Sequence, residues 1–159
     1  MSAGAPPAGA GSTERVPPFR FSARSRVDVS DTDLGAVVYY GRYPIHLDRA
    51  VLAYRRHLGI PLLGPEGHLF VVRSLAIEYV SSARFDDEIE VFVRVSELGR
   101  IRHTMTARME RVWGDRSEHL ADARLELVGL AGYGARPSRV PAAMRDAIVA
   151  FEGMEASAA

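Results

Sequence analysis

The sequence predicts an α+β fold in which a curved antiparallel sheet of about five strands wraps around one long helix. One amphipathic helical pattern lies early in the chain, and four consecutive strand patterns follow it. Two short turn sequences separate the last three strand patterns, as in hairpins. An open sheet of this kind has exposed edges and an uncovered back face that a second copy would protect, so we expect a homodimer or homotetramer.

Length and composition describe one globular domain with no strong charge. Of the 159 residues, 47% are hydrophobic and 25% are charged, and 20 basic residues balance 20 acidic ones. This balance argues against nucleic acid or a membrane surface as a partner. The chain contains no cysteine and no lysine, which excludes cysteine nucleophiles and lysine Schiff bases. No apolar run of about 18 residues could span a bilayer, so we expect a cytoplasmic protein.

The two ends of the chain are expected to be flexible tails. Residues 1–18 are rich in Ala, Gly, Pro and Ser, and residues 152–159 have a similar composition. Such segments bury too little apolar surface to offset the entropy lost on ordering. The single domain is therefore expected to span residues 19–151.

The domain begins with a strand, a loop and the long helix. Polar and apolar residues alternate over 19–29, which suits a strand with one wet face. After a loop over 30–42, helical spacing predicts a helix over 43–58, which Gly59 and Pro61 end. The apolar stripe of that helix consists of Tyr43, Leu47, Ala50, Val51, Tyr54 and Leu58.

Four strands and a final helix complete the domain. The strand patterns cover residues 68–80, 88–98, 101–113 and 119–130. Glycines at 99 and 114 begin plausible hairpin turns, so the last three strands should form an antiparallel meander. The final helix is expected to begin at Pro141, where the missing N–H costs nothing.

The loop over 30–42 concentrates carboxylates, glycines and tyrosines before the helix. A helix N-terminus presents unpaired N–H groups, which suit a carbonyl oxygen that gains negative charge during acyl transfer. The N–H of Tyr40 or Gly41 would supply such a donor. A carboxylate a few residues upstream, as Asp33 is, could activate water or attack the carbonyl. On spacing alone a structural role is favoured, because Asp31 and Asp33 are common turn and N-cap residues.

The whole string resembles the 4-hydroxybenzoyl-CoA thioesterase family of hot dog proteins over about residues 21–151. The matching motifs are Asp31-Thr32-Asp33, Gly35-Ala36-Val37-Val38-Tyr39-Tyr40, Tyr43, Leu47-Asp48-Arg49-Ala50, the stretch from Tyr79 to Val91, and Arg136-Pro137 before Val140-Pro141. The resemblance implies that Asp33 is the catalytic carboxylate, that the Tyr40 N–H polarises the thioester carbonyl, and that Asp31 gives structural support. It implies no cofactor. Relatives often have a second glycine where this chain has Ala36.

Four further residues are candidates for substrate binding. Asp48 lies at the border of the apolar stripe, where a solvent-facing role is favoured. If its carboxylate instead faces the acyl pocket, it would accept a hydrogen bond from a ring hydroxyl, and hydroxybenzoyl-type relatives also have aspartate there. Arg100 and Arg102 lie at the hairpin where the family places phosphate-binding residues, and Arg84 is a weaker candidate. Exposed turn arginines are common, so both interpretations remain open.

The predicted function is hydrolysis of an acyl-CoA thioester, with a hydroxy-aromatic acyl group as one candidate. Asp33 would act as general base or as nucleophile, because both roles need the same carboxylate in the same place. One alternative is a thioesterase for a polyketide or fatty acyl group on a carrier protein, although enediyne-type relatives typically lack the aspartate. Another is a non-catalytic hot dog module that binds acyl thioesters or only oligomerises. The five histidines show no metal-ligand spacing, so they are expected at the surface or in packing roles.

Overall fold

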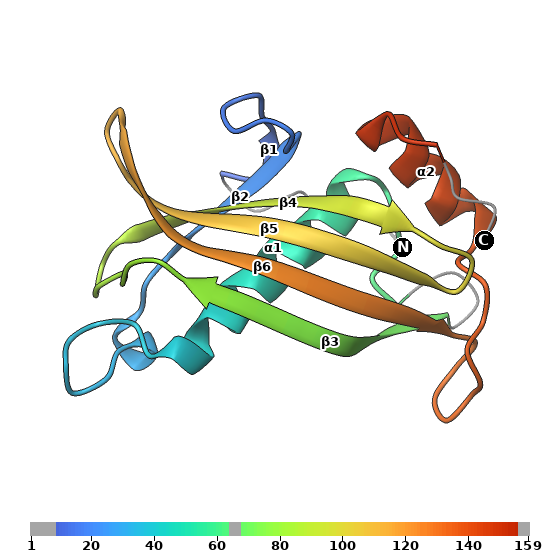
Figure 1. The fold of residues 1–159 in the computed structure, drawn as a ribbon, viewed down its shortest axis with the longest axis horizontal. Coiled ribbons are helices and arrows are strands. Elements are labelled where there is room, and N and C mark those ends of the chain that lie inside the picture. Colours follow the sequence, from blue (N-terminus) through green and yellow to red (C-terminus); the bar gives the residue numbers. More distant parts are fainter. Residues whose placement is uncertain (1–8, 64–67, 156–159) are drawn as a thin grey trace.

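A curved antiparallel sheet wraps around one long helix in the computed structural model, which describes residues 9–63 and 68–155 (Figure 1). The strands are β1 (Gly11–Ser12), β2 (Phe21–Arg26), β3 (Leu69–Tyr79), β4 (Glu88–Leu98), β5 (Arg102–Trp113) and β6 (Arg116–Leu130). The helices are η1 (Val29–Asp31), η2 (Tyr40–Arg42), α1 (Tyr43–His57) and α2 (Ala142–Glu152). The predicted fold class is confirmed.

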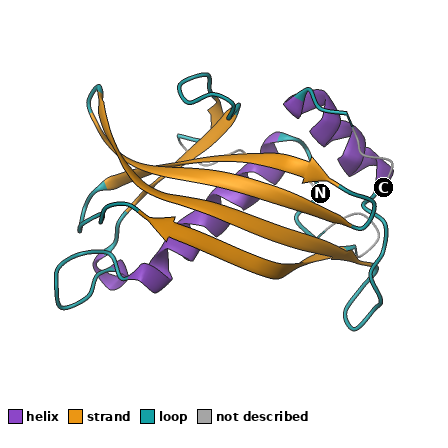
Figure 2. Cartoon of the chain, in the orientation of Figure 1, coloured by secondary structure: helices purple, strands orange, loops and turns teal. Residues whose placement is uncertain are grey.

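The six strands form one sheet in the order β1-β2-β4-β5-β6-β3, and every neighbouring pair is antiparallel. The predicted meander of β4, β5 and β6 is confirmed. The long connection through α1 separates β2 from β3 in sequence, and β3 then returns to the far edge beside β6. Figure 2 shows α1 lying across one face of the sheet, so the sheet has a concave face toward the helix and a convex face away from it.

The core lies between α1 and the concave face. The predicted stripe of α1 is buried except at Leu58, which is partly buried. Alternation along β4 turns Val91, Val93 and Val95 toward the helix, and all three are almost fully buried. The helix ends at a backbone turn in which Gly59 adopts a φ of 70°, as its sequence signal predicts.

The chain ends differ from the predicted tails where the structure describes them. In the N-terminal segment, β1 pairs with β2, and Arg15 forms ion pairs of 2.8 Å with the buried carboxylates of Glu90 and Glu110 on the convex face. The Arg15 guanidinium also lies 4.7 Å from the ring centre of Phe92. At the other end, Glu152 is buried. Residues 1–8 and 156–159 of the predicted tails lie outside the described residues.

Strand β3 is an edge strand with little cover on either face. Its register with β6 turns Val72, Leu75 and Tyr79 to the concave side, where they are 54%, 39% and 45% exposed. The body of α1 packs on β2 and β4 rather than on this strand. An apolar strip beside an unpaired edge is therefore left uncovered in a single chain. None of the helices within the described residues is long and apolar enough to cross a membrane.

Candidate active site

Asp33 lies in a small hairpin between η1 and η2. An isolated β-bridge joins Thr32 to Val38, and the Asp33 N–H donates to the Val37 carbonyl at 3.0 Å. The exposed Asp33 carboxylate accepts the Gly35 N–H through Oδ1 at 2.7 Å. Ala36 turns the hairpin with a φ of 58°, in the left-handed region that glycine adopts without strain. The hairpin thus places a solvent-accessible carboxylate beyond the start of the helix.

The predicted N–H donors lie at the N-terminal end of α1. Helix η2 runs directly into α1, and within the described residues neither the Tyr40 N–H nor the Gly41 N–H has a hydrogen-bond acceptor. The Tyr40 carbonyl accepts a hydrogen bond from the Tyr79 hydroxyl at 2.8 Å. Unpaired N–H groups at the positive end of a helix dipole are suited to bind an oxyanion.

Backbone hydrogen bonds close the base of the hairpin and tie it to the turn before β4. The Tyr39 N–H donates to the Asp31 carbonyl at 2.9 Å, and the Val38 N–H donates to the Ala83 carbonyl at 2.8 Å. Asp33 and Tyr40 therefore lie at the same end of the molecule. A second isolated bridge joins Val37 to Arg84, which places Arg84 at this end as well.

A cluster of polar side chains, formed by Asp31, His46 and Ser25, lies beneath the hairpin. Asp31 is 4% exposed, and its Oδ2 accepts the Asp28 N–H at 2.9 Å and lies 3.4 Å from Nε2 of His46. The His46 Nδ1 lies 2.7 Å from the Ser25 hydroxyl. Burial lowers the pKa of His46 in spite of the opposing effect of Asp31. Sequence reasoning assigned His46 to the surface or to packing; its place three residues after Tyr43 was the one signal that it faces inward.

Asp48 lies on the exposed face of α1 and has no hydrogen-bond or ion-pair partner among the described residues. Desolvation by its surroundings raises the pKa of its carboxyl. In a single chain, Asp48 lies on the open side of the helix together with Leu52, which is 36% exposed. In the isolated chain the Asp48 side chain is therefore exposed to solvent, which is the orientation that the sequence favoured.

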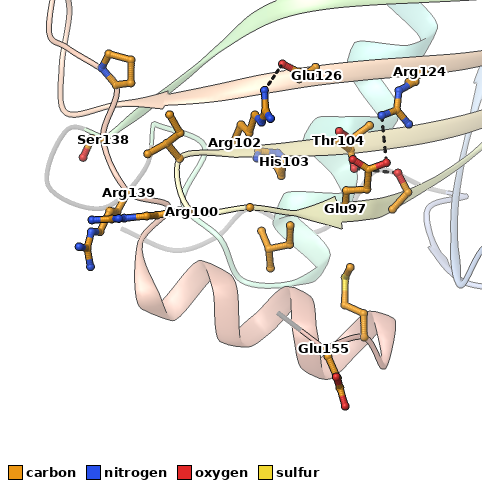
Figure 3. Close-up of a pocket in the computed structure, with 16 residues that line it drawn as sticks. Glu97, Arg100, Arg102, His103, Thr104, Arg124, Glu126, Ser138, Arg139 and Glu155 are labelled. Atoms are coloured by element: carbon orange, nitrogen blue, oxygen red, sulfur yellow. Dashed lines mark hydrogen bonds and ion pairs between the residues drawn. The ribbon is translucent and has the colours of Figure 1, made fainter. Parts of the chain in front are cut away.

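Arg100 and Arg102 line a pocket of about 1210 Å³ at the β4–β5 hairpin (Figure 3). The guanidinium of Arg102 lies 3.6 Å from the Glu126 carboxylate, whereas Arg100 has no acidic partner among the described residues. Arg139 contributes a further cation from the segment before α2. The pocket therefore offers cations suited to phosphate groups.

The pocket and the hairpin lie at opposite ends of the sheet. Strand β4 runs from Glu88, next to the turn that pairs with the Asp33 hairpin, to Leu98 at the pocket. Ten steps of about 3.3 Å separate these ends by roughly 33 Å. In Figure 1 the loop between β2 and α1 and the turn between β4 and β5 lie at opposite ends of the sheet. A single chain thus brings Asp33, Tyr40, Gly41 and Arg84 together but not Arg100 or Arg102.

The donor set at this site suits acyl transfer. No cluster of three or more His, Asp or Glu side chains that could hold a metal ion occurs among the described residues. An exposed carboxylate at the same end of the molecule as N–H groups without an acceptor among the described residues combines a base or nucleophile with an oxyanion donor. Those are the two functions that hydrolysis of an ester or thioester requires.

Known proteins resemble the chain in sequence and in fold. A sequence model of the thioesterase superfamily matches residues 35–116. The chain is 42% identical over 81 residues to acyl-CoA thioesterase YbgC of Haemophilus influenzae, which covers 49% of this chain and 60% of that protein. It is 30% identical over 118 residues to acyl-CoA thioester hydrolase YbgC of Escherichia coli, which covers 73% of this chain and 86% of that protein. The match thus spans less than two thirds of the first relative and more than two thirds of the second.

The fold likeness extends to almost the whole chain. A crystal structure of a thioesterase superfamily protein from Jannaschia matches with a TM-score of 0.80 at 21% sequence identity and covers 89% of each chain. At that identity the likeness concerns the fold alone. It agrees with the sheet wrapped around α1 in Figure 1.

Proposed function

The chain belongs to the thioesterase superfamily, as its sequence predicts, and on this basis we propose that it hydrolyses an acyl-CoA thioester to the free acid and CoA. One observation carries the proposal: the accessible Asp33 carboxylate lies at the same end of the molecule as the unpaired N–H groups of Tyr40 and Gly41. The relatives named acyl-CoA thioesterases supply the substrate class.

In the proposed mechanism, the thioester carbonyl oxygen accepts the Tyr40 N–H, and the Gly41 N–H is the second donor available. The dipole of α1 adds to this stabilisation as negative charge develops on the oxygen. Asp33 then either removes a proton from a water molecule whose oxygen attacks the carbonyl carbon, or attacks that carbon itself; in both routes the carbon–sulfur bond breaks and the CoA thiolate leaves. Hydrolysis of the acyl-enzyme would complete the second route. Both routes need the free oxygen of Asp33, and the Gly35 N–H fixes the other.

The active unit in this proposal is a homodimer with sites at the subunit interface. Strand β3 has an open edge and an apolar strip beside it, which a second β3 could cover. A two-fold axis across that edge pairs the strands antiparallel, so it sets the hairpin end of one chain beside the pocket end of the other. Arg100 of the partner subunit and Arg102 of the partner subunit would then serve the site of Asp33. A tetramer would require a further contact between dimers.

We place the acyl group on the face of the chain that the dimer would cover. Asp48 and the apolar strip of β3 would line the acyl site once the dimer covers them. The raised pKa of the Asp48 carboxyl is consistent with an acceptor or donor for a ring hydroxyl in a partly dry pocket. A panel of benzoyl, hydroxybenzoyl, phenylacetyl and straight-chain CoA thioesters tests this assignment, and turnover confined to straight chains would remove the polar role of Asp48.

Replacement of Asp33 tests the proposed chemistry. Asp33→Asn keeps the Gly35 hydrogen bond but removes the charge, so we expect kcat to fall by about 10²- to 10⁴-fold with unchanged folding. Release of CoA is measured with a thiol reagent, and folding by circular dichroism. The matched control is Asp86→Asn on the exposed neighbouring turn, where the φ of 67° suits asparagine. Near wild-type turnover by Asp33→Asn would contradict the assignment.

The same assay separates the alternatives. An acyl group that turns over on a carrier protein but not on CoA would indicate the carrier-protein substrate. Binding of acyl-CoA without thiol release would indicate a non-catalytic module. The cytoplasmic location remains a prediction of the sequence.

A further inference from the structure

The buried His46 side chain links three elements beneath the Asp33 hairpin. It lies in the first turn of α1 with 0% of its side chain exposed. Its Nδ1 is 2.7 Å from the Ser25 hydroxyl on β2, and its Nε2 is 3.4 Å from the Asp31 carboxylate at the end of η1. An apolar side chain would fill this volume without burying polar nitrogen atoms. The imidazole is therefore placed between a hydroxyl and a carboxylate for more than packing.

The surroundings of His46 define where its proton lies. A bare Nε2 would place two acceptors next to each other, whereas a protonated Nε2 faces the Asp31 carboxylate favourably. The Ser25 hydroxyl then donates to Nδ1. Burial and the positive charge of Arg49 lower the pKa of His46, while Asp31 raises it, and the net direction is downward. A neutral imidazole with its proton on Nε2 suits both neighbours: Nδ1 faces the Ser25 hydroxyl, and Nε2, which has no hydrogen-bond acceptor within the described residues, lies near the Asp31 carboxylate.

Asp31 connects this imidazole to the candidate catalytic groups. Its carboxylate accepts the Asp28 N–H at 2.9 Å, and its carbonyl accepts the Tyr39 N–H at 2.9 Å. Asp31 therefore anchors both sides of the hairpin base. On one side of the hairpin base, Asp33 lies two residues after Asp31. On the other side, Tyr40 directly follows Tyr39, whose N–H binds the Asp31 carbonyl. Any movement of Asp31 changes the distance between the carboxylate and the oxyanion donor.

We infer that His46 is a positioning residue, which holds Asp31 and thereby keeps the Asp33 carboxylate and the Tyr40 N–H in their reactive arrangement. The inference rests on the proposed thioesterase function. The Asp31 carboxylate is buried, and His46 brings Nε2 next to it from α1, the helix that directly follows the Tyr40 and Gly41 donors of η2. Its contact of 3.4 Å is long for a hydrogen bond, so its effect is on placement rather than on proton transfer.

Three substitutions at His46 separate positioning from packing. His46→Phe removes both polar contacts and keeps the shape. His46→Asn keeps a partner for Ser25, and His46→Gln keeps an N–H that reaches Asp31. We expect kcat to fall by about 10- to 100-fold in the Phe and Asn variants, with KM changed by less than about threefold, because a displacement of about 1 Å has this effect on reactive groups. The Gln variant should recover most of the loss.

The control variant is His57→Phe at the other end of α1. The His57 ring lies between those of Phe21 and Phe151, at centre-to-centre distances of 5.2 and 5.5 Å, so its replacement perturbs the same helix far from the hairpin. Its kcat should equal that of the wild type. Melting curves of all variants ensure that kcat is compared where each protein is folded.

Three results would overturn the inference. The first is a His46→Phe variant with kcat within about threefold of wild type. The second is a His46→Gln variant as slow as the Phe variant. The third is a double variant of His46→Phe and Asp31→Asn in which the losses of the two single variants add. Coupled residues should instead give a double variant no slower than the worse single one. If wild-type protein releases no thiol from any acyl-CoA, the proposed function fails. Wild-type release with unaffected His46 variants refutes the positioning role alone.

Discussion

Asp33 has both a structural role in a turn and a proposed chemical role, which a sequence alone presents as alternatives. Its Oδ1 atom closes a turn with the Gly35 N–H, as a structural aspartate would. The side chain nevertheless remains exposed at the end of the molecule where two helix N–H groups are unpaired. The turn fixes the carboxylate, and the fixed carboxylate is what the proposed reaction needs. A reactive group held by its own backbone loses little entropy when substrate binds.

The buried His103 should make stability depend on pH. Burial, with a smaller effect of Arg55, lowers the pKa of His103 from 6.5 to about 3. Between these values the unfolded chain binds a proton that the folded chain does not, so the free energy of unfolding falls as the pH is lowered through this window. The slope from this group is at most about 1.4 kcal/mol per pH unit.

Urea unfolding of wild type and His103→Gln at about pH 7 and about pH 5 checks this prediction. Gln does not titrate, so the variant should lose less stability on acidification than the wild type. Carboxylates contribute equally to both proteins and cancel in the comparison. Equal losses in the two proteins would contradict a neutral buried imidazole.

At the scale of the element, α2 is held to the core through its last residue. The Tyr54 hydroxyl on α1 donates to Oε1 of Glu152 at 2.6 Å, and the Val95 N–H donates to the same oxygen at 3.1 Å. All the groups in this contact are buried. A buried carboxylate keeps its place only while its donors remain, so this pair fixes the end of α2 against α1 and β4.

Tyr54→Phe should therefore destabilise the protein by about 2 kcal/mol, because it leaves the Glu152 carboxylate with one donor instead of two. Equilibrium urea unfolding measures the change. The control is Tyr133→Phe, which removes the hydroxyl of a tyrosine that is 94% exposed and should have no effect. A Tyr54→Phe variant as stable as the control would show that the Val95 N–H alone satisfies Glu152.

At the scale of the whole molecule, the separation of the two candidate sites argues for a dimer. The hairpin with Asp33 and the pocket with Arg100 lie at opposite ends of the sheet, and β3 leaves its edge and its concave strip uncovered. A thioester with a phosphate-bearing CoA group needs both sites within reach. In the proposed dimer, an antiparallel pair of β3 strands would provide that and would bury the apolar strip.

Leu75→Glu should convert the proposed dimer into a monomer and reduce thiol release by at least about tenfold. It places a charge on the apolar strip, where burial of an unpaired carboxylate is unfavourable. Light scattering after gel filtration measures the mass. Ala76→Glu on the opposite face of the same strand is the control and should leave the mass unchanged. A monomeric wild type, or a fully active monomeric variant, would contradict the dimer.

The sequence by itself determined the main elements and the family, but not β1, which lies in the predicted N-terminal tail. The helical stripe from Tyr43 to Tyr54, the alternation of β4 and the glycine turns are local patterns, and local patterns reflect which face of each element is buried. The string around Asp33 likewise identified the superfamily, because its residues are contiguous. The predicted roles of Asp33, Tyr40 and the arginines remain proposals.

Only the tertiary structure decided which distant residues meet. It placed Arg100 and Arg102 at the far end from Asp33, buried His46 against Asp31, and set Arg15 of the supposed tail on Glu90 and Glu110. Each of these arrangements involves residues that are far apart in sequence or on different elements. Their positions depend on the strand registers and on where α1 packs against the sheet. No periodicity within one segment carries that information, because long-range pairing depends on how all the elements pack together.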